Sequence, residues 1–166
     1  IALARSDSGL TQAASRAGLC FHLKDFNVKE GLCMGGIETL DLGTMVKNAV
    51  KGVFSTMLSL DVANNDEDPE RKLEGDKLMG CVGFAGDASG VVCIEMTADF
   101  ARFITASMLG EDPSEIQGPD EVNDVIGELC NMVGGNLKSR FCDSGYPCVL
   151  TIPSITHGSD FRISKM

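Results

Sequence analysis

Positive charge is scarce in this sequence, and long apolar runs are missing altogether. Its 166 residues include 14 lysines and arginines against 24 aspartates and glutamates, which gives a net charge of −10. Nucleic acids and anionic membranes would repel such a chain, so neither is expected as a partner. No run approaches the roughly 18 apolar residues that a membrane span requires. A basic surface on another protein is the better electrostatic match.

Metal-binding spacing is also absent. The seven cysteines form no Cys-x-x-Cys pair, and His22 and His157 lie far apart, so we expect no metal site. Cys81, Cys93 and Cys148 lie within apolar runs, where cysteine behaves as a small buried hydrophobe. We expect reduced structural thiols in a cytoplasmic protein, and histidines that serve only as surface or core residues.

The amino-terminal residues carry little pattern. The chain begins IALARSDSGL, with no initiator methionine and no long apolar core of a secretory signal, so we expect a processed chain or a fragment. Residues 1–40 are interpreted as a poorly defined extension in which LCFHL could form a short strand. Residues 41–166 are interpreted as one domain.

Apolar spacing predicts helices and strands in that domain. A helix is expected over residues 42–60 with Asp41 as its N-cap, and another runs from Thr97 to Gly110. Between them, LMGCVGFA and VVCIEM flank the turn GDASG, which predicts a hairpin over residues 78–96.

The last part of the domain is expected to add β-structure. YPCVLTIP reads as a strand, followed by a turn at residues 157–159 and a short apolar run, FRIS. The short connections leave no room for repeated parallel crossovers. The sequence therefore predicts an α+β fold with a mainly antiparallel sheet packed against long helices.

The clearest helix pattern begins at Pro119 and runs to about Phe141. Its apolar residues recur every three or four positions. Its other side carries Asp124, Glu128 and Asn131, at spacings that bring them close together. The glycines 127, 134 and 135 are interpreted as bordering this polar face and leaving room for a partner backbone.

These residues resemble the signature of the CheX/CheC/FliY family of chemotaxis phosphatases. The resemblance rests on VIGELCNMVGGNLKSRF with its Glu128-x-x-Asn131 motif, on TIPSITHG with Pro153, on the hairpin and on the MLGE helix ending. It covers about residues 42–164. The helix over residues 42–60 lacks a second Glu-x-x-Asn motif, so one site per chain is expected, as in the CheX branch.

The resemblance implies a CheC-like fold and hydrolysis of the phospho-aspartate of a CheY-type response regulator. Asn131 would orient the attacking water, and Glu128 would pair with the regulator's active-site lysine. Asp124, Gly127, Gly135 and Pro153 would contribute to partner binding. The chain needs no cofactor of its own, because Mg²⁺ would belong to the regulator. The resemblance also implies a homodimer.

Two alternatives stay open. The same helix could serve a non-catalytic module that binds the regulator, such as a flagellar switch or scaffold component. Family members continue with further β-structure beyond the position of FRIS, whereas this chain ends at Met166. The domain is therefore expected either to be truncated at its C-terminus or to use LCFHL at that sheet edge.

Overall fold

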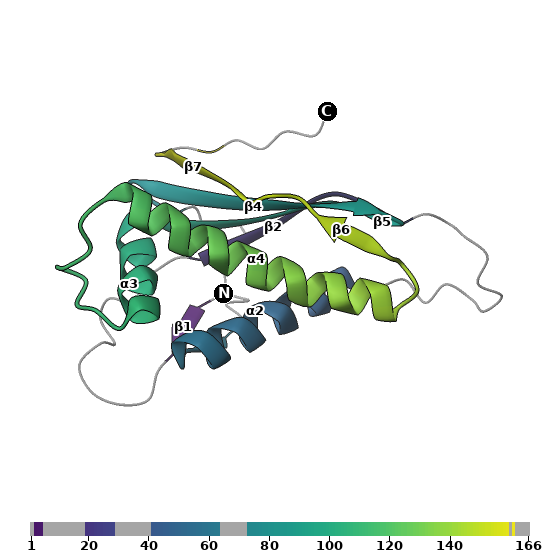
Figure 1. The fold of residues 1–166 in the computed structure, drawn as a ribbon, viewed down its shortest axis with the longest axis horizontal. Coiled ribbons are helices and arrows are strands. Elements are labelled where there is room, and N and C mark those ends of the chain that lie inside the picture. The colour runs from purple at the N-terminus through teal and green to yellow at the C-terminus, as the bar shows by residue number, and fades with distance from the viewer. Residues whose placement is uncertain (1, 5–18, 29–40, 64–72, 160, 162–166) are drawn as a thin grey trace.

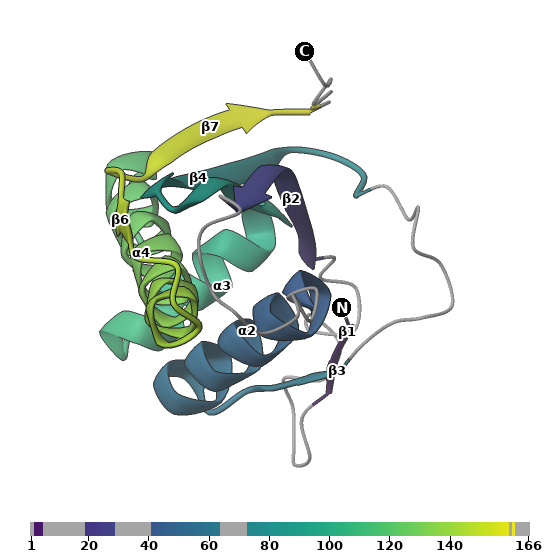
Figure 2. The same ribbon diagram turned by 90° about the vertical axis from the view of Figure 1, so that its right-hand side faces the viewer.

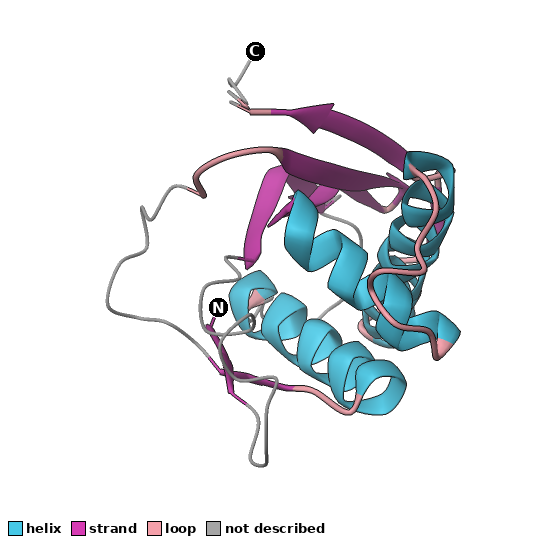
Figure 3. Cartoon of the chain, turned by 90° about the vertical axis from the view of Figure 1, so that its left-hand side faces the viewer, coloured by secondary structure: helices cyan, strands magenta, loops and turns pink. Residues whose placement is uncertain are grey.

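The computed structural model describes residues 2–4, 19–28, 41–63, 73–159 and 161. The helices lie on one side of the larger antiparallel sheet (Figures 1 and 3). The predicted α+β class is confirmed. In chain order the elements are β1 (Ala2–Ala4), β2 (Leu19–Val28), α2 (Leu42–Leu58), β3 (Asp61–Ala63), β4 (Lys77–Gly86), β5 (Ala88–Thr97), α3 (Ala98–Leu109), α4 (Pro119–Asp143), β6 (Cys148–Leu150) and β7 (Ser154–Gly158).

The larger sheet has five strands in the order β2-β5-β4-β6, with β7 also paired to β4. Strand β6 pairs with the end of β4 from Phe84 to Gly86, and β7 pairs with its beginning from Lys77 to Cys81. Both short strands therefore occupy one edge of β4, with a break between them. All of these pairings are antiparallel, as the sequence predicts. Strands β1 and β3 form a separate two-stranded sheet.

The hairpin predicted over residues 78–96 is confirmed by β4 and β5. Alternating side chains of these strands, including Leu78, Val82, Val92 and Ile94, are buried in the core because successive residues of a strand point to opposite faces. On the other face, Lys77 Nζ lies 3.3 Å from a carboxylate oxygen of Glu95.

Helix boundaries follow local capping, as predicted. Asp41 accepts a hydrogen bond from the Thr44 amide at 3.0 Å at the start of α2, and Thr97 accepts one from the Phe100 amide at 3.3 Å at the start of α3. Gly110 ends α3 with a left-handed φ of 74°. Helix α2 ends at Leu58, earlier than the predicted residue 60, because Ser59 adopts a left-handed conformation.

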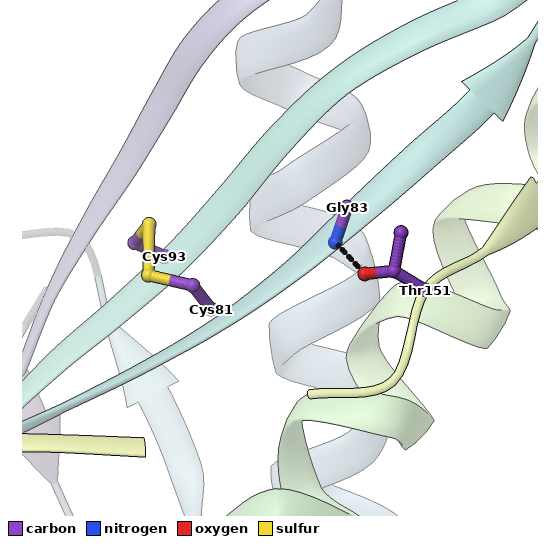
Figure 4. Close-up of a disulfide and its surroundings, with 4 residues drawn as sticks. All are labelled: Cys81, Gly83, Cys93 and Thr151. Atoms are coloured by element: carbon purple, nitrogen blue, oxygen red, sulfur yellow. Dashed lines mark hydrogen bonds between the residues drawn. A yellow bond between two sulfur atoms is a disulfide. The ribbon is translucent and has the colours of Figure 1, made fainter. Parts of the chain in front are cut away.

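The strand expected over YPCVLTIP is shorter than predicted, and the turn expected at residues 157–159 is wrong. Strand β6 stops at Leu150, and β7 begins at Ser154 and includes His157. Between them, the Thr151 hydroxyl accepts a hydrogen bond from the Gly83 amide at 2.9 Å (Figure 4). The Gly83 amide therefore bonds to a side chain instead of a backbone carbonyl, and Pro153 has no amide hydrogen to donate. These two features interrupt the backbone pairing with β4 between β6 and β7.

The predicted amino-terminal strand is confirmed, because LCFHL forms the beginning of β2. Strand β2 pairs with β5 and occupies the edge of the sheet opposite β6 and β7. Leu19 lies in the core, so residues 19–28 join the sheet of the predicted domain, while the division at residue 40 stays a prediction. Residues 2–4 of the extension form β1, whereas its other residues and nearly all of FRIS lie outside the described residues.

The prediction of reduced thiols is wrong for two cysteines. Cys81 and Cys93 form a disulfide across the hairpin, with their Cα atoms 4.1 Å apart (Figure 4). They are directly opposed in the register of β4 and β5, which explains why two residues in separate apolar runs can bond. Cys130, Cys142 and Cys148 are free thiols, and Cys148 is buried as expected.

Candidate functional site

Helix α4 carries the polar face that the sequence singles out. Pro119 occupies its first turn, where a missing amide hydrogen costs nothing. Asp120 and Glu121 also lie in the first turn, where their negative charges interact favourably with the positive end of the helix dipole. One side of the helix is buried against the core through a stripe of apolar residues, namely Val122, Ile126, Leu129, Val133, Leu137 and Phe141. This stripe fixes which side of α4 faces outward.

The outward side brings together the three residues that the sequence predicts. Asp124 and Glu128 are exposed, and Asn131 is half-buried. Their spacing places Glu128 about 6 Å along the helix axis from Asp124, and Asn131 about 4.5 Å further. None of these three side chains forms a hydrogen bond or an ion pair with any other described residue. Two carboxylates four residues apart repel each other, so a cation brought by a partner would stabilise this surface.

Glycine leaves open space on both sides of Asn131. Gly127 and Gly135 lie four residues before and four residues after it, and a methyl group added at either would meet no atom within 4 Å. Gly134 is different. A methyl group there would lie 3.0 Å from Val82 Cγ1 and 3.5 Å from Leu150. The expectation that Gly134 borders the polar face is therefore wrong, because it serves close packing of α4 on the sheet.

Strands β6 and β7 run beside α4 (Figure 2). His157 on β7 is held to Asn123 on α4 by a hydrogen bond of 2.7 Å between His157 Nε2 and the Asn123 side-chain oxygen. Pro153 is half-buried immediately before β7. The structure thus brings Pro153 to the sheet edge that runs beside α4, although it lies 22 positions after Asn131 in the sequence.

The histidine contact was not predicted from the sequence, which assigned His157 no role beyond the surface or the core. Its partner Asn123 is 34 residues away in the chain, so no local pattern could pair them. The only available signal was alternation. Once β7 is recognised as a strand, Ile155 and His157 fall two residues apart and share one side.

Cys130 immediately precedes Asn131 but is unsuited to nucleophilic chemistry. Its side chain is buried, and burial raises the pKa of its thiol to about 12. The thiolate is the reactive form of cysteine, so this residue stays protonated near neutral pH. It packs instead against β4, since a methyl group added at Gly80 would collide with its sulfur.

The described residues contain no group of three His, Cys, Asp or Glu side chains placed to hold a metal ion. Within the same part of the chain, no helix is long and apolar enough to cross a membrane. The chemistry available at the outward face of α4 is therefore that of carboxylates and an amide, namely binding a cation and holding a polar molecule through hydrogen bonds.

Comparison with known proteins gives a family and a set of similar structures. The family described as "Chemotaxis phosphatase CheX" matches residues 78–166, which is the part of the chain from β4 onward. No curated protein sequence matches the chain.

Several solved structures share the fold. A chemotaxis protein CheX from Vibrio vulnificus is 28% identical with a TM-score of 0.62, over 75% of this chain and 79% of that one. A CheC-like superfamily protein from Shewanella sp. PV-4 is 28% identical with a TM-score of 0.60, over 75% and 81%. A CheX–CheY–BeF3–Mg²⁺ complex from Borrelia burgdorferi is 21% identical with a TM-score of 0.54, over 69% and 75%.

Proposed function

This chain belongs to the chemotaxis phosphatase CheX family, and from that membership we propose that it hydrolyses the phospho-aspartate of a CheY-type response regulator. The observation that carries the proposal is the amide of Asn131 on an open helix face, with Glu128 one turn away and a glycine on each side. The similar Borrelia burgdorferi protein has been crystallised as a CheX–CheY–BeF3–Mg²⁺ complex, which supports a CheY-type partner here.

The proposed reaction needs little activation by the enzyme. An aspartyl phosphate is already an activated mixed anhydride, so a water molecule can attack the phosphorus in line with the leaving carboxylate. One phosphorus–oxygen bond forms to the water, and the bond to the aspartate oxygen breaks. The products are inorganic phosphate and the regulator's free aspartate. Catalysis then consists mainly of positioning the water.

Asn131 is assigned that positioning. Its amide offers a carbonyl oxygen that accepts a hydrogen bond from the water and an NH₂ group that donates to a phosphoryl oxygen. The side chain is half-buried, so its orientation is restricted before the partner arrives. Because Gly127 and Gly135 flank it without side chains, the regulator's phosphorylated residue can approach the amide closely.

Glu128 is assigned a docking role. It is exposed one helical turn before Asn131 and would pair with a lysine beside the phosphorylated aspartate of the regulator. Asp124, a further turn away, would extend the acidic surface at the edge of this contact, and Pro153 would fix the adjoining segment. Mg²⁺ bound to the regulator would neutralise charge on the phosphoryl group, and α4 supplies no ligand to it.

Replacing Asn131 by alanine tests the catalytic role. We expect the rate of dephosphorylation to fall by at least about 100-fold while the affinity for the regulator changes little, because the lost interaction acts mainly in the transition state. Rates are measured as phosphate release from a phosphorylated CheY-type regulator, and affinity with the same regulator carrying Mg²⁺ and beryllofluoride in place of the phosphoryl group.

Asn136→Ala is the matched control for that experiment. Asn136 is an amide on the same helix, but it accepts a hydrogen bond from Arg140 at 3.2 Å and faces α2, so its loss should leave turnover intact. An unchanged rate in Asn131→Ala would rule out the proposed positioning. If the unaltered protein bound the regulator without releasing phosphate, the alternative of a non-catalytic binding module would be correct.

Glu128→Gln tests the docking contact. The substitution keeps the shape of the side chain and removes its charge, so we expect the dissociation constant to rise by about tenfold, as loss of a charge-assisted hydrogen bond implies. Binding is measured with the beryllofluoride-loaded regulator. An affinity equal to that of the unaltered protein would contradict the assignment of Glu128 to a lysine.

A further inference from the structure

The segment between β6 and β7 exposes an apolar side chain at the edge of the sheet that runs beside α4. Ile152 is 90% exposed, whereas Leu150 and Ile155 on either side of it pack against the core. Single exposed apolar side chains are common on protein surfaces. Ile152 differs from such isolated side chains in its position near α4 and in the fixed conformation of its backbone.

Contacts along the sheet edge establish the position. Leu150 lies next to Gly134, because a methyl group added at that glycine would be 3.5 Å from the Leu150 side chain. Ile155 lies at the level of Cys130, since both side chains approach the same point above Gly80. The segment therefore passes from the level of residue 134 to that of residue 130 as it runs from Leu150 to Ile155. Asn131 lies between those two levels, so Ile152 lies at about the same height along α4 as Asn131.

The conformation of the segment is fixed on both sides of Ile152. Thr151 donates its amide hydrogen to the Gly83 carbonyl and accepts the Gly83 amide hydrogen with its hydroxyl, both at 2.9 Å. On the other side, the ring of Pro153 restricts its own backbone and that of Ile152. An exposed side chain on a backbone that is already ordered loses little entropy when a partner covers it.

We propose that Ile152 is an apolar anchor for the response regulator, forming with the α4 face one continuous docking surface. This inference rests on the proposed function, and its occupant is the same CheY-type regulator. The polar side chains of α4 would then fix the register and perform the chemistry, while burial of Ile152 adds affinity. A central apolar contact surrounded by polar groups is a common arrangement in protein interfaces.

Substitution of Ile152 by serine tests the proposal. We expect KM for the phosphorylated regulator, and the dissociation constant of its beryllofluoride–Mg²⁺ form, to rise about tenfold while kcat changes less than about twofold. Ile152→Val should restore most of the affinity. The side chain is almost fully exposed, so urea unfolding should give the same stability for all variants.

Val149→Ser is the matched control. Val149 is 60% exposed on the same segment, but it pairs with Ala85 next to the inward-facing pair of Phe84 and Leu150, so its side chain points to the face of the sheet away from α4. We expect it to leave KM unchanged.

The outcomes separate the two proposals. If the unaltered protein releases phosphate and Ile152→Ser has the same KM, the anchor is wrong and the phosphatase proposal stands. If the unaltered protein has no activity and no affinity for the regulator, the proposed function itself fails. A change in sedimentation mass with unchanged regulator affinity would assign Ile152 to self-association and overturn the anchor.

Discussion

Asn131 and Glu128 differ in exposure in a way that suits their assigned tasks. The amide is half-buried and the carboxylate is exposed. A group that positions a water gains from restricted motion, because the geometry must already be correct when the substrate arrives. A group that reaches for a partner's lysine can remain flexible. The glycines four residues to either side of Asn131 were visible in the sequence, and their open surroundings are a property of the folded helix.

At the same scale, Cys130 gives a prediction about pH. Its thiol has a pKa raised from 9.0 to about 12 by burial, so the folded state binds a proton that the unfolded state has already lost between these values. Stability should therefore fall as pH rises from about 9 towards 12, by at most about 1.4 kcal/mol per pH unit. The measurement is urea unfolding at several pH values, compared with Cys130→Ala.

The difference in stability between the unaltered protein and Cys130→Ala at each pH reports this thiol alone, because other groups that titrate in the same range are present in both. Parallel pH profiles for the unaltered protein and Cys130→Ala would show that burial does not perturb the thiol. Cys142, which is exposed, gives an internal check, since iodoacetamide should modify it in the folded protein and leave Cys130 unmodified.

At the scale of elements, α4 combines two kinds of glycine. Gly127 and Gly135 lie at open positions, and Gly134 lies against Val82 on β4. The sequence predicts the helix and its polar face from local periodicity, but it groups all three glycines together. Positions 134 and 135 are adjacent and differ by about 100° around the helix. Which of them faces the sheet depends on how the helix is rotated against β4, which no local pattern reports.

Alanine substitutions should separate these roles. Gly127→Ala should stabilise the isolated protein by about 0.5–1 kcal/mol, because alanine favours the helix and meets no neighbour. It should also weaken regulator binding if this face docks closely. Gly134→Ala should instead destabilise the protein by about 1–3 kcal/mol, because Val82 is buried and has little room to move.

Urea unfolding and binding of the beryllofluoride-loaded regulator measure both effects. Greater stability with unchanged affinity in Gly127→Ala would mean that the helix face is not approached closely. A Gly134→Ala variant as stable as the unaltered protein would mean that β4 and α4 can separate slightly at little cost.

At the scale of the whole molecule, charge should influence association. The chain carries a net charge of −10, and the proposed docking face exposes Asp124 and Glu128. Dissolved ions weaken interactions between exposed charges. Raising NaCl from about 0.05 M to about 0.5 M should therefore weaken binding of the regulator several-fold, with a smaller change for Glu128→Gln. An affinity that is independent of salt would contradict an electrostatic contribution from this face.

The predicted homodimer can be examined by sedimentation in the same buffers.

Elements whose causes are local could be predicted from the sequence alone. Asp41 and Thr97 cap helices through residues three positions away, the apolar stripe of α4 repeats within each turn, and the hairpin closes across a short turn. These features depend on neighbouring residues, so periodicity and turn chemistry are enough to predict them.

How distant segments meet depends on tertiary packing, which the sequence pattern does not report. The disulfide of Cys81 depends on strand register, and the contact between His157 and Asn123 joins residues 34 positions apart. The exposed Ile152 follows Thr151, which is bonded to Gly83 on β4. Each arises from packing between elements far apart in the chain. The sequence names the polar residues of α4, and the fold supplies the sheet edge beside them.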